Sequence, residues 1–562
     1  MKDPNLAFPN ADTARQRFAQ GAPHLRLVSR NGSSEFSPNS RTMKWLFWAG
    51  TIAILVMSCL VSLTNFATQD ESWFLRVLQR VTDGEVLYRD VYYPLLPLPV
   101  YVGVAATSLL GSNFQVLQAL FFACFIVNCW LTYRCAHLLK IKPLAMVVLA
   151  LAVAVWASPA AVDHVWSLYQ PLAQLFLLVS LFMLLRWMEH ANSGRLGFDL
   201  TIAAIASGAG FASKDQVGLL AFAALLCGVL AVSHYRGFAL LEVVKSGIKI
   251  VAIFTATVLL TLVPTVLQGG WNRFAEYFVF ERTQVIPTSS IPFTDGIKYF
   301  SYLVAGRIFL EDPFETLHYS MYVIVPIVAA ILFGMFLRRR SEDGVRAIVL
   351  FCFSMAAVFS VYPRADVWHI LYLGFVFALC LIFAIDRLLT SPVLRNAVLG
   401  TLSLCLIGGF AEIAWAGIVR IERLDYHYLR LPHFEYAMAS GSNIQQMKRD
   451  RDTLQAAAAV APVFLLTDEA GFYYLISGIK NPTSIDYPMV ASMGRNGEAD
   501  MIRAIQASKD GWVCVKSYRE PLLRPARLEG FVRSQLQFVN QLGFCDMYRL
   551  DSSNADGESN GN

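Results

Sequence analysis

The stretch 68–99 reads TQDESWFLRVLQRVTDGEVLYRDVYYPLLPLP and decides the fold. It places the adjacent carboxylates of Asp70 and Glu71 a few residues beyond an apolar run at 45–65 that is long enough to cross a membrane. A short amphipathic segment follows, and then a group of tyrosines punctuated by prolines. Acidic side chains held at a membrane surface beside apolar surface suit the transfer of a hydrophilic group from a lipid-linked donor.

The composition of the whole chain indicates a membrane protein. Of its 562 residues, 56% are hydrophobic and 15% are charged, and the mean hydropathy is +0.48. Residues 1–43 are different, because they are rich in Asn, Ser, Pro and Arg and lack the apolar core of a signal peptide, so they predict a disordered cytoplasmic tail. We therefore expect a polytopic α-helical membrane protein whose N-terminus lies inside.

Apolar runs divide residues 44–418 into about eleven expected transmembrane helices. They lie at 45–65, 114–133, 143–160, 168–188, 197–213, 215–234, 247–268, 319–337, 346–362, 370–386 and 396–418. With the N-terminus inside, most arginine and lysine residues of the connections fall in the cytoplasm, whereas Lys214 and Arg364 fall in short outward connections. This distribution obeys the positive-inside rule and predicts that the last helix exits outward.

The first outer loop, 66–113, contains a further apolar run at 92–110. Counting this run as a crossing would move all the later basic loops outside, against the positive-inside rule. Pro94, Pro97 and Pro99 also suit the entrance of a helix better than the middle of a regular one. We therefore expect a juxtamembrane or re-entrant helix on the outer face.

Residues 419–550 predict a small extracytoplasmic α/β domain. Strands are expected at 462–468, 512–516 and 545–550, and helices at 472–477 and 528–542. Cys514 and Cys545 lie near these strands in an oxidising compartment, so a disulfide between them is one outcome and free thiols are the other. Residues 551–562 predict a disordered tail. The sequon at Asn31 falls on the inner side, which favours a bacterial inner membrane with a periplasmic C-terminal domain.

Three segments share a pattern with one known superfamily. Asp70-Glu71 is followed by GEVLYRDVYYPLLPLPVYVGVAATSLLG at 84–111, residues 211–218 read FASKDQVG, and residues 362–369 read YPRADVWH. These resemble the first outer loop, the Thr-Lys-x-x-Gly segment and the Asp-x-x-His loop of GT-C glycosyltransferases. The similarity is to bacterial relatives of protein O-mannosyltransferases and of the lipid A aminoarabinose transferase. A Pro-Pro-Leu motif of these families is replaced here by PLLPL at 94–98.

The resemblance implies an inverting glycosyltransferase that uses a polyprenyl-phosphate sugar and an acceptor hydroxyl on the outer face. Such a reaction needs a general base for the acceptor and positive charge for the leaving phosphate. Asp70 is the candidate base because it takes the first position of the pair, and Glu71 is expected to orient the acceptor or share the role. The candidate phosphate contacts are Lys214, Arg282 and Arg364. A local ion pair between Lys214 and Asp215 would explain the lysine without a donor.

The remaining candidates are weaker. Candidate substrate contacts are Tyr88, Asp90, Tyr93, Asp163, His164 and His369. A turn salt bridge would explain Asp90 nearly as well, and a helix cap would explain Asp163 as well. Oxygen ligands at Asp70, Glu71 and Asp163 would suit a divalent cation such as Mg²⁺ or Mn²⁺, but no ligand spacing requires one.

Two alternative functions stay open. A polysaccharide ligase or polymerase that uses pyrophosphate-linked oligosaccharides would concentrate arginines in a large loop, and the loop at 269–318 contains Arg273, Arg282 and Arg307. A lipid or sugar transporter would show internal repeats, which the sequence lacks. The expected partners are the lipid-linked donor, membrane lipid and a lipid, glycan or protein acceptor, with no nucleic acid. The sequence leaves open which sugar moves and onto which acceptor.

Overall fold

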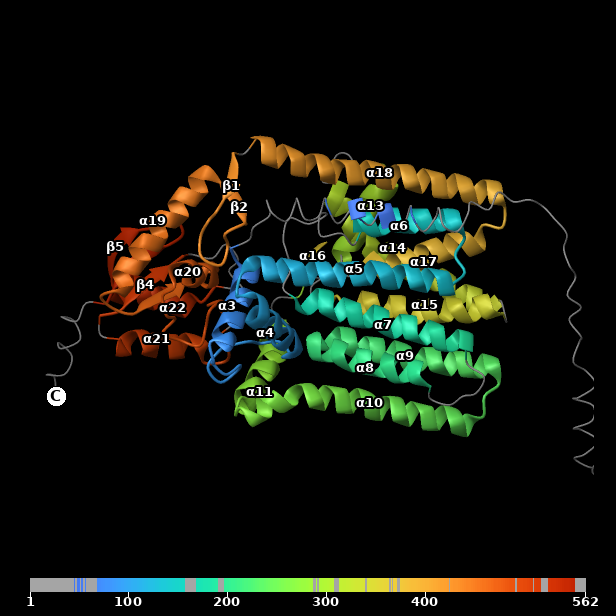
Figure 1. Cartoon of the computed structure of the whole chain (residues 1–562), viewed down its shortest axis with the longest axis horizontal. Helices are drawn as coiled ribbons and strands as arrows, with labels where there is room; N and C mark the ends of the chain where they lie inside the picture. Colours follow the sequence, from blue (N-terminus) through green and yellow to red (C-terminus); the bar gives the residue numbers. More distant parts are fainter. Residues whose placement is uncertain are drawn as a thin grey trace, which may run out of the picture.

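The computed structural model combines a bundle of long helices with a small α/β domain at one end (Figure 1). It describes residues 68–550 and a few positions between 45 and 56, apart from gaps at 157–167, 191–196, 287–289, 291–292, 308–312, 339–340, 363–364, 366, 371–373, 424, 491–492, 509 and 517–523. This architecture confirms the predicted fold class. The two expected tails and most of the first expected crossing lie outside the described residues.

The helices of the bundle coincide with the expected crossings that follow the first one. They are α5 (Phe114–Leu138), α6 (Pro143–Trp156), α7 (Tyr169–His190), α8 (Phe198–Ser213), α9 (Asp215–Arg236), α10 (Leu240–Leu267), α14 (Pro313–Arg338), α15 (Glu342–Phe359), α17 (Gly374–Leu388) and α18 (Pro392–Arg423). Within the described residues, six helices are long and apolar enough to span a membrane. The protein is therefore a multi-pass membrane protein, and the number of eleven crossings stays a prediction.

The helices alternate in direction and separate the charges between the two ends of the bundle. We call the end that carries the α/β domain the domain end (Figure 1). Arg236 and Arg338 lie in the last turns of α9 and α14, and His137 lies in the last turn of α5. These three helix ends lie away from the domain (Figure 1). Lys214 lies at the α8–α9 turn, at the domain end. The basic residues of these last turns and Lys214 therefore lie at opposite ends of the bundle, while the orientation of the bundle in the membrane stays a prediction.

The first outer loop forms two short helices at the domain end, α3 (Asp70–Thr82) and α4 (Leu98–Leu110). With 13 residues, α4 is about 20 Å long, well short of the ~30 Å hydrocarbon core. Pro97 and Pro99 lie at its start, where a missing N–H breaks no helical hydrogen bond. A Cβ atom at Gly103 would lie 2.6 Å from Leu78 Cδ1, so α4 packs closely on α3.

The loop expected at 269–318 is largely helical. It contains α11 (Trp271–Phe280), a continuing π-helical turn η2 (Glu281–Val285) and α13 (Thr294–Val304), and the short α16 (Val367–Ile370) lies in a later connection. Phe274, Tyr277 and Phe280 form the buried face of α11. Phe274 and Tyr277 pack into the same core as α3 and the C-terminal domain, so α11 belongs structurally to the domain end.

The C-terminal domain has a four-stranded sheet in the order β3-β4-β6-β5. Strand β3 (Val463–Leu466) pairs in parallel with β4 (Trp512–Val515), while β6 (Asp546–Arg549) pairs antiparallel with β4 and with β5 (Gln537–Gln541). A small hairpin of β1 (Tyr426–Tyr428) and β2 (Met438–Ser440) joins the domain to the bundle. The helices of the domain are α19 (Gly441–Ala458), α20 (Ala470–Ser477), α21 (Gly497–Ala507) and α22 (Ala526–Gln535).

The prediction of one helix over 528–542 is wrong in its second half. Helix α22 ends at Gln535, and the following residues form the edge strand β5. Pairing with β6 satisfies the backbone of this segment, and the ring of Phe538 lies 5.7 Å from that of Tyr548 across the pair. Cross-strand contacts of this kind override a weak helical preference.

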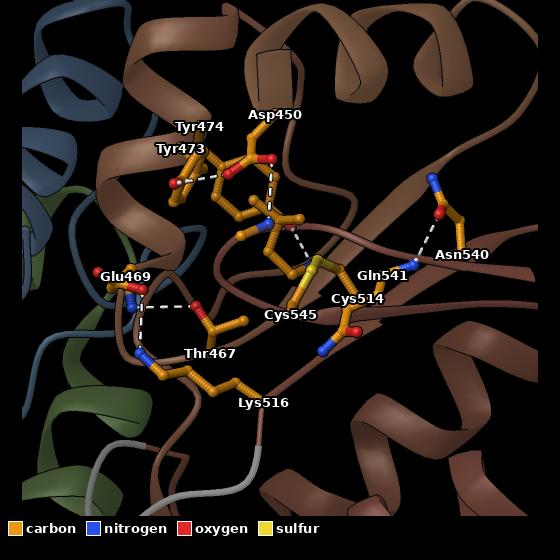
Figure 2. The surroundings of a disulfide bond; sticks show 12 residues. Asp450, Thr467, Glu469, Tyr473, Tyr474, Cys514, Lys516, Asn540, Gln541 and Cys545 are labelled. Atoms are coloured by element: carbon orange, nitrogen blue, oxygen red, sulfur yellow. Dashed lines mark hydrogen bonds and ion pairs between the residues drawn. A yellow bond between two sulfur atoms is a disulfide. The ribbon is translucent and has the colours of Figure 1, made fainter. Parts of the chain in front are cut away.

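A disulfide joins Cys514 of β4 to Cys545, just before β6 (Figure 2). The sequence left this pairing open, and the structure decides it. Asp450 of α19 supports the same region, because it accepts hydrogen bonds from the Gly543 N–H at 3.1 Å and the Tyr473 hydroxyl at 3.3 Å. The sheet is therefore fastened to α19 and α20, the helix that faces α3.

Candidate functional site

Asp70 and Glu71 open helix α3 in two different environments. Asp70 is exposed, whereas Glu71 is 3% exposed. Both lie in the first turn, where the helix dipole favours negative charge. Burial, together with the neighbouring charge of Asp70, raises the pKa of the Glu71 carboxyl well above its ordinary value. One carboxylate is therefore open to a reactant and the other is held within the protein.

The C-terminal domain forms a wall beside this carboxylate pair. A Cβ atom at Gly471 would lie 2.7 Å from Trp73 Cα, so only glycine lets α20 approach α3 this closely. Thr68 Oγ1 donates to Glu469 Oε1 at 2.7 Å. Lys516 Nζ lies 3.0 Å from Glu469 Oε2 (Figure 2). The two carboxylates thus lie at a contact between the first outer loop and the domain.

The tyrosines predicted as substrate contacts lie in the core of the first outer loop. Tyr88 and Tyr93 are both 0% exposed, and burial raises the pKa of each hydroxyl. The Tyr88 hydroxyl donates to the Leu95 carbonyl at 2.7 Å. Both rings are packed in this core, and their role as substrate contacts stays a prediction.

Asp90 takes part in a turn. Its carboxylate lies 2.8 Å from Arg89 Nη2 and accepts a hydrogen bond from the Val86 N–H at 2.9 Å. The hydrogen bond from Arg89 and that from Val86 lower the pKa of this carboxyl. The turn salt bridge that the sequence offered as an alternative is therefore present.

Lys214 is the one residue between α8 and α9, and its extended backbone reverses the chain. The turn is possible because Gly218 faces the preceding helix: a Cβ atom there would lie 1.8 Å from Phe211 N. The spacing of lysine and glycine in FASKDQVG thus has a structural cause. Lys214 is half-buried at this turn.

Arg282 of η2 forms an ion pair with Asp215, the first residue of α9. Arg282 Nη2 lies 2.5 Å and Nε 3.1 Å from Asp215 Oδ2, and the guanidinium carbon lies 3.2 Å from the ring centre of Phe278. This pair brings Arg282 to the α8–α9 turn that carries Lys214. Two of the three predicted phosphate contacts therefore meet at one junction.

Glu281 is a residue of this junction that the sequence analysis missed. Its Oε2 atom is buried and has no hydrogen-bond partner within the part of the chain that the structure describes. Burial raises the pKa of Glu281 to about 7, although Arg282 opposes the shift. The only sequence signal was its position next to a candidate cation.

The other candidates include three residues that the structure does not describe. Asp163, His164 and Arg364 lie outside the described residues, and His369 is half-buried on α16. Across the described ranges, no three His, Cys, Asp or Glu side chains are grouped so that they could hold a metal ion. A requirement for Mg²⁺ or Mn²⁺ stays a prediction.

Comparisons with solved structures give clear matches over most of the chain. ArnT from Cupriavidus metallidurans in the apo state is 13% identical with a TM-score of 0.55, covering 92% of this chain and 99% of that chain. ArnT bound to undecaprenyl phosphate is 12% identical with a TM-score of 0.54, covering 90% and 98%. The Archaeoglobus fulgidus oligosaccharyltransferase, in complex with Zn and sulfate, is 13% identical with a TM-score of 0.50, covering 82% and 68%.

At the level of sequence, no family model and no curated protein matches the chain. The structural likeness nevertheless extends over both the helix bundle and the C-terminal domain, because it covers 92% of this chain. Both ArnT and the oligosaccharyltransferase are GT-C enzymes. The chain therefore has the GT-C fold.

Proposed function

We propose that this protein is an inverting glycosyltransferase that moves a sugar from a polyprenyl-phosphate donor to an acceptor hydroxyl at the outer membrane face. One observation carries the proposal. An accessible carboxylate, Asp70, and two cations, Lys214 and Arg282, lie at the same end of the bundle. The fold is shared with ArnT, which binds undecaprenyl phosphate in one of its structures.

The proposed step is a single displacement. Asp70 takes the proton of the acceptor hydroxyl. At the same time the acceptor oxygen attacks the anomeric carbon, and the bond from that carbon to the donor phosphate breaks. The attack comes from the face opposite the phosphate, so the configuration inverts. Glu71 would orient the acceptor or share the role, and its raised pKa favours the neutral form of its own carboxyl.

Lys214 and Arg282 would stabilise the leaving polyprenyl phosphate. Charge on the bridging oxygen grows as the sugar departs, so cations held in place lower the barrier. Asp215 and the Phe278 carbonyl occupy three N–H groups of Arg282. A guanidinium carries five such donors, so two have no partner among the residues that the structure describes and could bind phosphate oxygens.

Two successive experiments test the proposal. Lipid extracted from the purified protein should contain a polyprenyl-phosphate sugar by mass spectrometry, and this lipid then serves as the donor in a transfer assay. We expect Asp70→Asn to lose activity by ~10²–10⁴, whereas Asp83→Asn, at the exposed other end of α3, should be normal. Normal activity of Asp70→Asn with an inactive Glu71→Gln would transfer the role to Glu71. Activity of both single variants and the double variant would exclude the pair.

A further inference from the structure

A polar cavity lies at the domain end, apart from the carboxylate pair. Its volume is about 150 Å³, roughly ten times the space that one water molecule needs. The first outer loop and α11 form one side, and the region around α21 of the C-terminal domain forms most of the rest. Polar residues that line it include Arg89, Arg273, Glu276, Asn496 and Asp500.

The inner wall of the cavity is fixed by packing. The ring centres of Tyr92 and Tyr277 lie 4.3 Å apart, and both side chains are buried. The Tyr92 N–H donates to the Ser484 carbonyl at 2.8 Å, which ties the first outer loop to the domain. Gly494 has φ +73°, and a Cβ atom there would lie 3.4 Å from the Tyr277 ring. The cavity is therefore preorganised, which reduces the entropy cost of binding.

The charges of the cavity balance. Arg273 Nη1 lies 3.1 Å from Glu276 Oε2, Arg89 is paired with Asp90, and Asp500 is paired with Arg503. Two arginines and two carboxylates line the cavity, so no net charge attracts a phosphate or another anion. The lining instead offers both donors, from Arg89, Arg273 and Asn496, and acceptors, from Glu276 and Asp500. Sugar hydroxyls both donate and accept, so an uncharged pyranose suits this lining better than an ion.

The cavity is close to the proposed donor phosphate but separate from it. Tyr277 lines it, and Arg282 lies five residues further along the same helical segment, about 7 Å along the axis. The Tyr92–Tyr277 pair forms the wall on that side. Most of the residues that line the cavity belong to the C-terminal domain. The lipid of a donor would instead lie along the helix bundle. A sugar of the acceptor therefore fits this place better than the sugar of the donor.

We propose that this cavity is a carbohydrate subsite that binds an uncharged pyranose residue of the acceptor, an assignment to the acceptor that rests on the proposed transferase function. The acceptor would then be a glycan or glycolipid with a sugar beyond the one that receives the transferred group.

Saturation-transfer NMR on the purified full chain tests the binding without any turnover. The probes are glucose, galactose, mannose and N-acetylglucosamine, each added alone. In the wild type, we expect saturation to be transferred from the protein to at least one of these sugars. This NMR signal should be lost in Ala504→Phe, because the phenylalanine ring fills the cavity. The control is Ala507→Phe, an exposed position on the same helix, which should keep the signal. No transfer to any sugar, or an unchanged signal in Ala504→Phe, would overturn the subsite.

Kinetics then decide between the two sources of the sugar. In the transfer assay, Ala504→Phe should raise the KM of the acceptor about tenfold, equivalent to ~1.4 kcal/mol, and leave the KM of the donor unchanged. A rise in the KM of the donor alone would overturn the assignment to the acceptor. Because the NMR measurement needs no catalysis, it separates failure of the subsite from failure of the proposed reaction.

Discussion

At the scale of single residues, Glu281 links the candidate donor site to pH. Burial raises its pKa from an ordinary 4.5 to about 7. Between these values the folded protein binds more protons than the unfolded chain, so the stabilising contribution present below pH 4.5 is lost as the pH rises through about 7. An ionised Glu281 would also place negative charge beside Arg282, where the donor phosphate is expected.

We predict that Glu281→Gln weakens this pH dependence. Raising the pH from 5 to 8 should destabilise the wild type more than the variant, by up to roughly 3 kcal/mol. Thermal unfolding in detergent at both pH values measures the difference. Glu276→Gln is the control, because Glu276 is only half-buried and lies on the adjoining helix. If the stability of the wild type and that of Glu281→Gln depend equally on pH, the raised pKa of Glu281 is contradicted.

At the scale of elements, the turn between α8 and α9 depends on Gly218. We expect Gly218→Ala to destabilise the protein by several kcal/mol or to prevent folding, because the added methyl group would lie 1.8 Å from Phe211 N. Gly334→Ala is the control, since nothing lies within 4 Å of a Cβ atom at that position of α14. Melting temperature and expression level measure both variants. A Gly218→Ala protein as stable as Gly334→Ala would show that the helices are not packed in this way.

The long helices could be predicted from the sequence because apolar runs of transmembrane length are a strong signal. The helical turn carrying Lys214 was visible as a motif for the same reason, since Lys214 interrupts two such runs. The edge strand β5 was missed because its pairing with β6 is a tertiary contact. The ion pair between Arg282 and Asp215 joins residues 67 positions apart, and no local pattern reveals such a partner. The same limit hid Glu281, whose burial depends on packing.

At the scale of the whole molecule, Asp486 fastens the C-terminal domain to α3. This residue is 1% exposed. Its carboxylate lies 2.8 Å from Arg80 Nη1 and 3.6 Å from Arg76 Nε, and it accepts a hydrogen bond from Asn481 at 2.9 Å. The network joins the domain to the helix that begins with Asp70. Domain docking and the geometry of the carboxylate pair are therefore coupled.

We predict that Asp486→Ala loosens this docking. Removing one member of a buried ion pair leaves charge without compensation and typically costs about 3–5 kcal/mol. Hydrogen exchange of α3 should become faster, while Asp510→Ala, an exposed change in the same domain, should leave it unchanged. Unchanged protection of α3 in Asp486→Ala would argue against the docking role.

Orientation in the membrane gives a separate prediction. The positive-inside distribution predicts that the domain end faces outward. Alkaline phosphatase fused after the C-terminal domain should be active in bacterial cells, and the same enzyme fused after Arg236, at the opposite end of the bundle, should be inactive. The reverse pair of results would place Asp70 and Lys214 in the cytoplasm.

The most direct test of the account is binding of undecaprenyl phosphate, compared with undecaprenol, by native mass spectrometry. The wild type should retain the phosphate lipid and bind the alcohol much more weakly. Lys214→Ala and Arg282→Gln should each raise the Kd for the phosphate lipid about tenfold, close to the 1.5–3 kcal/mol of a hydrogen bond to a charged group. Arg273→Ala, on exposed α11 surface, should leave it unchanged. Equal binding of the two lipids, or a Kd unaffected by both substitutions, would contradict a polyprenyl-phosphate donor held at this junction.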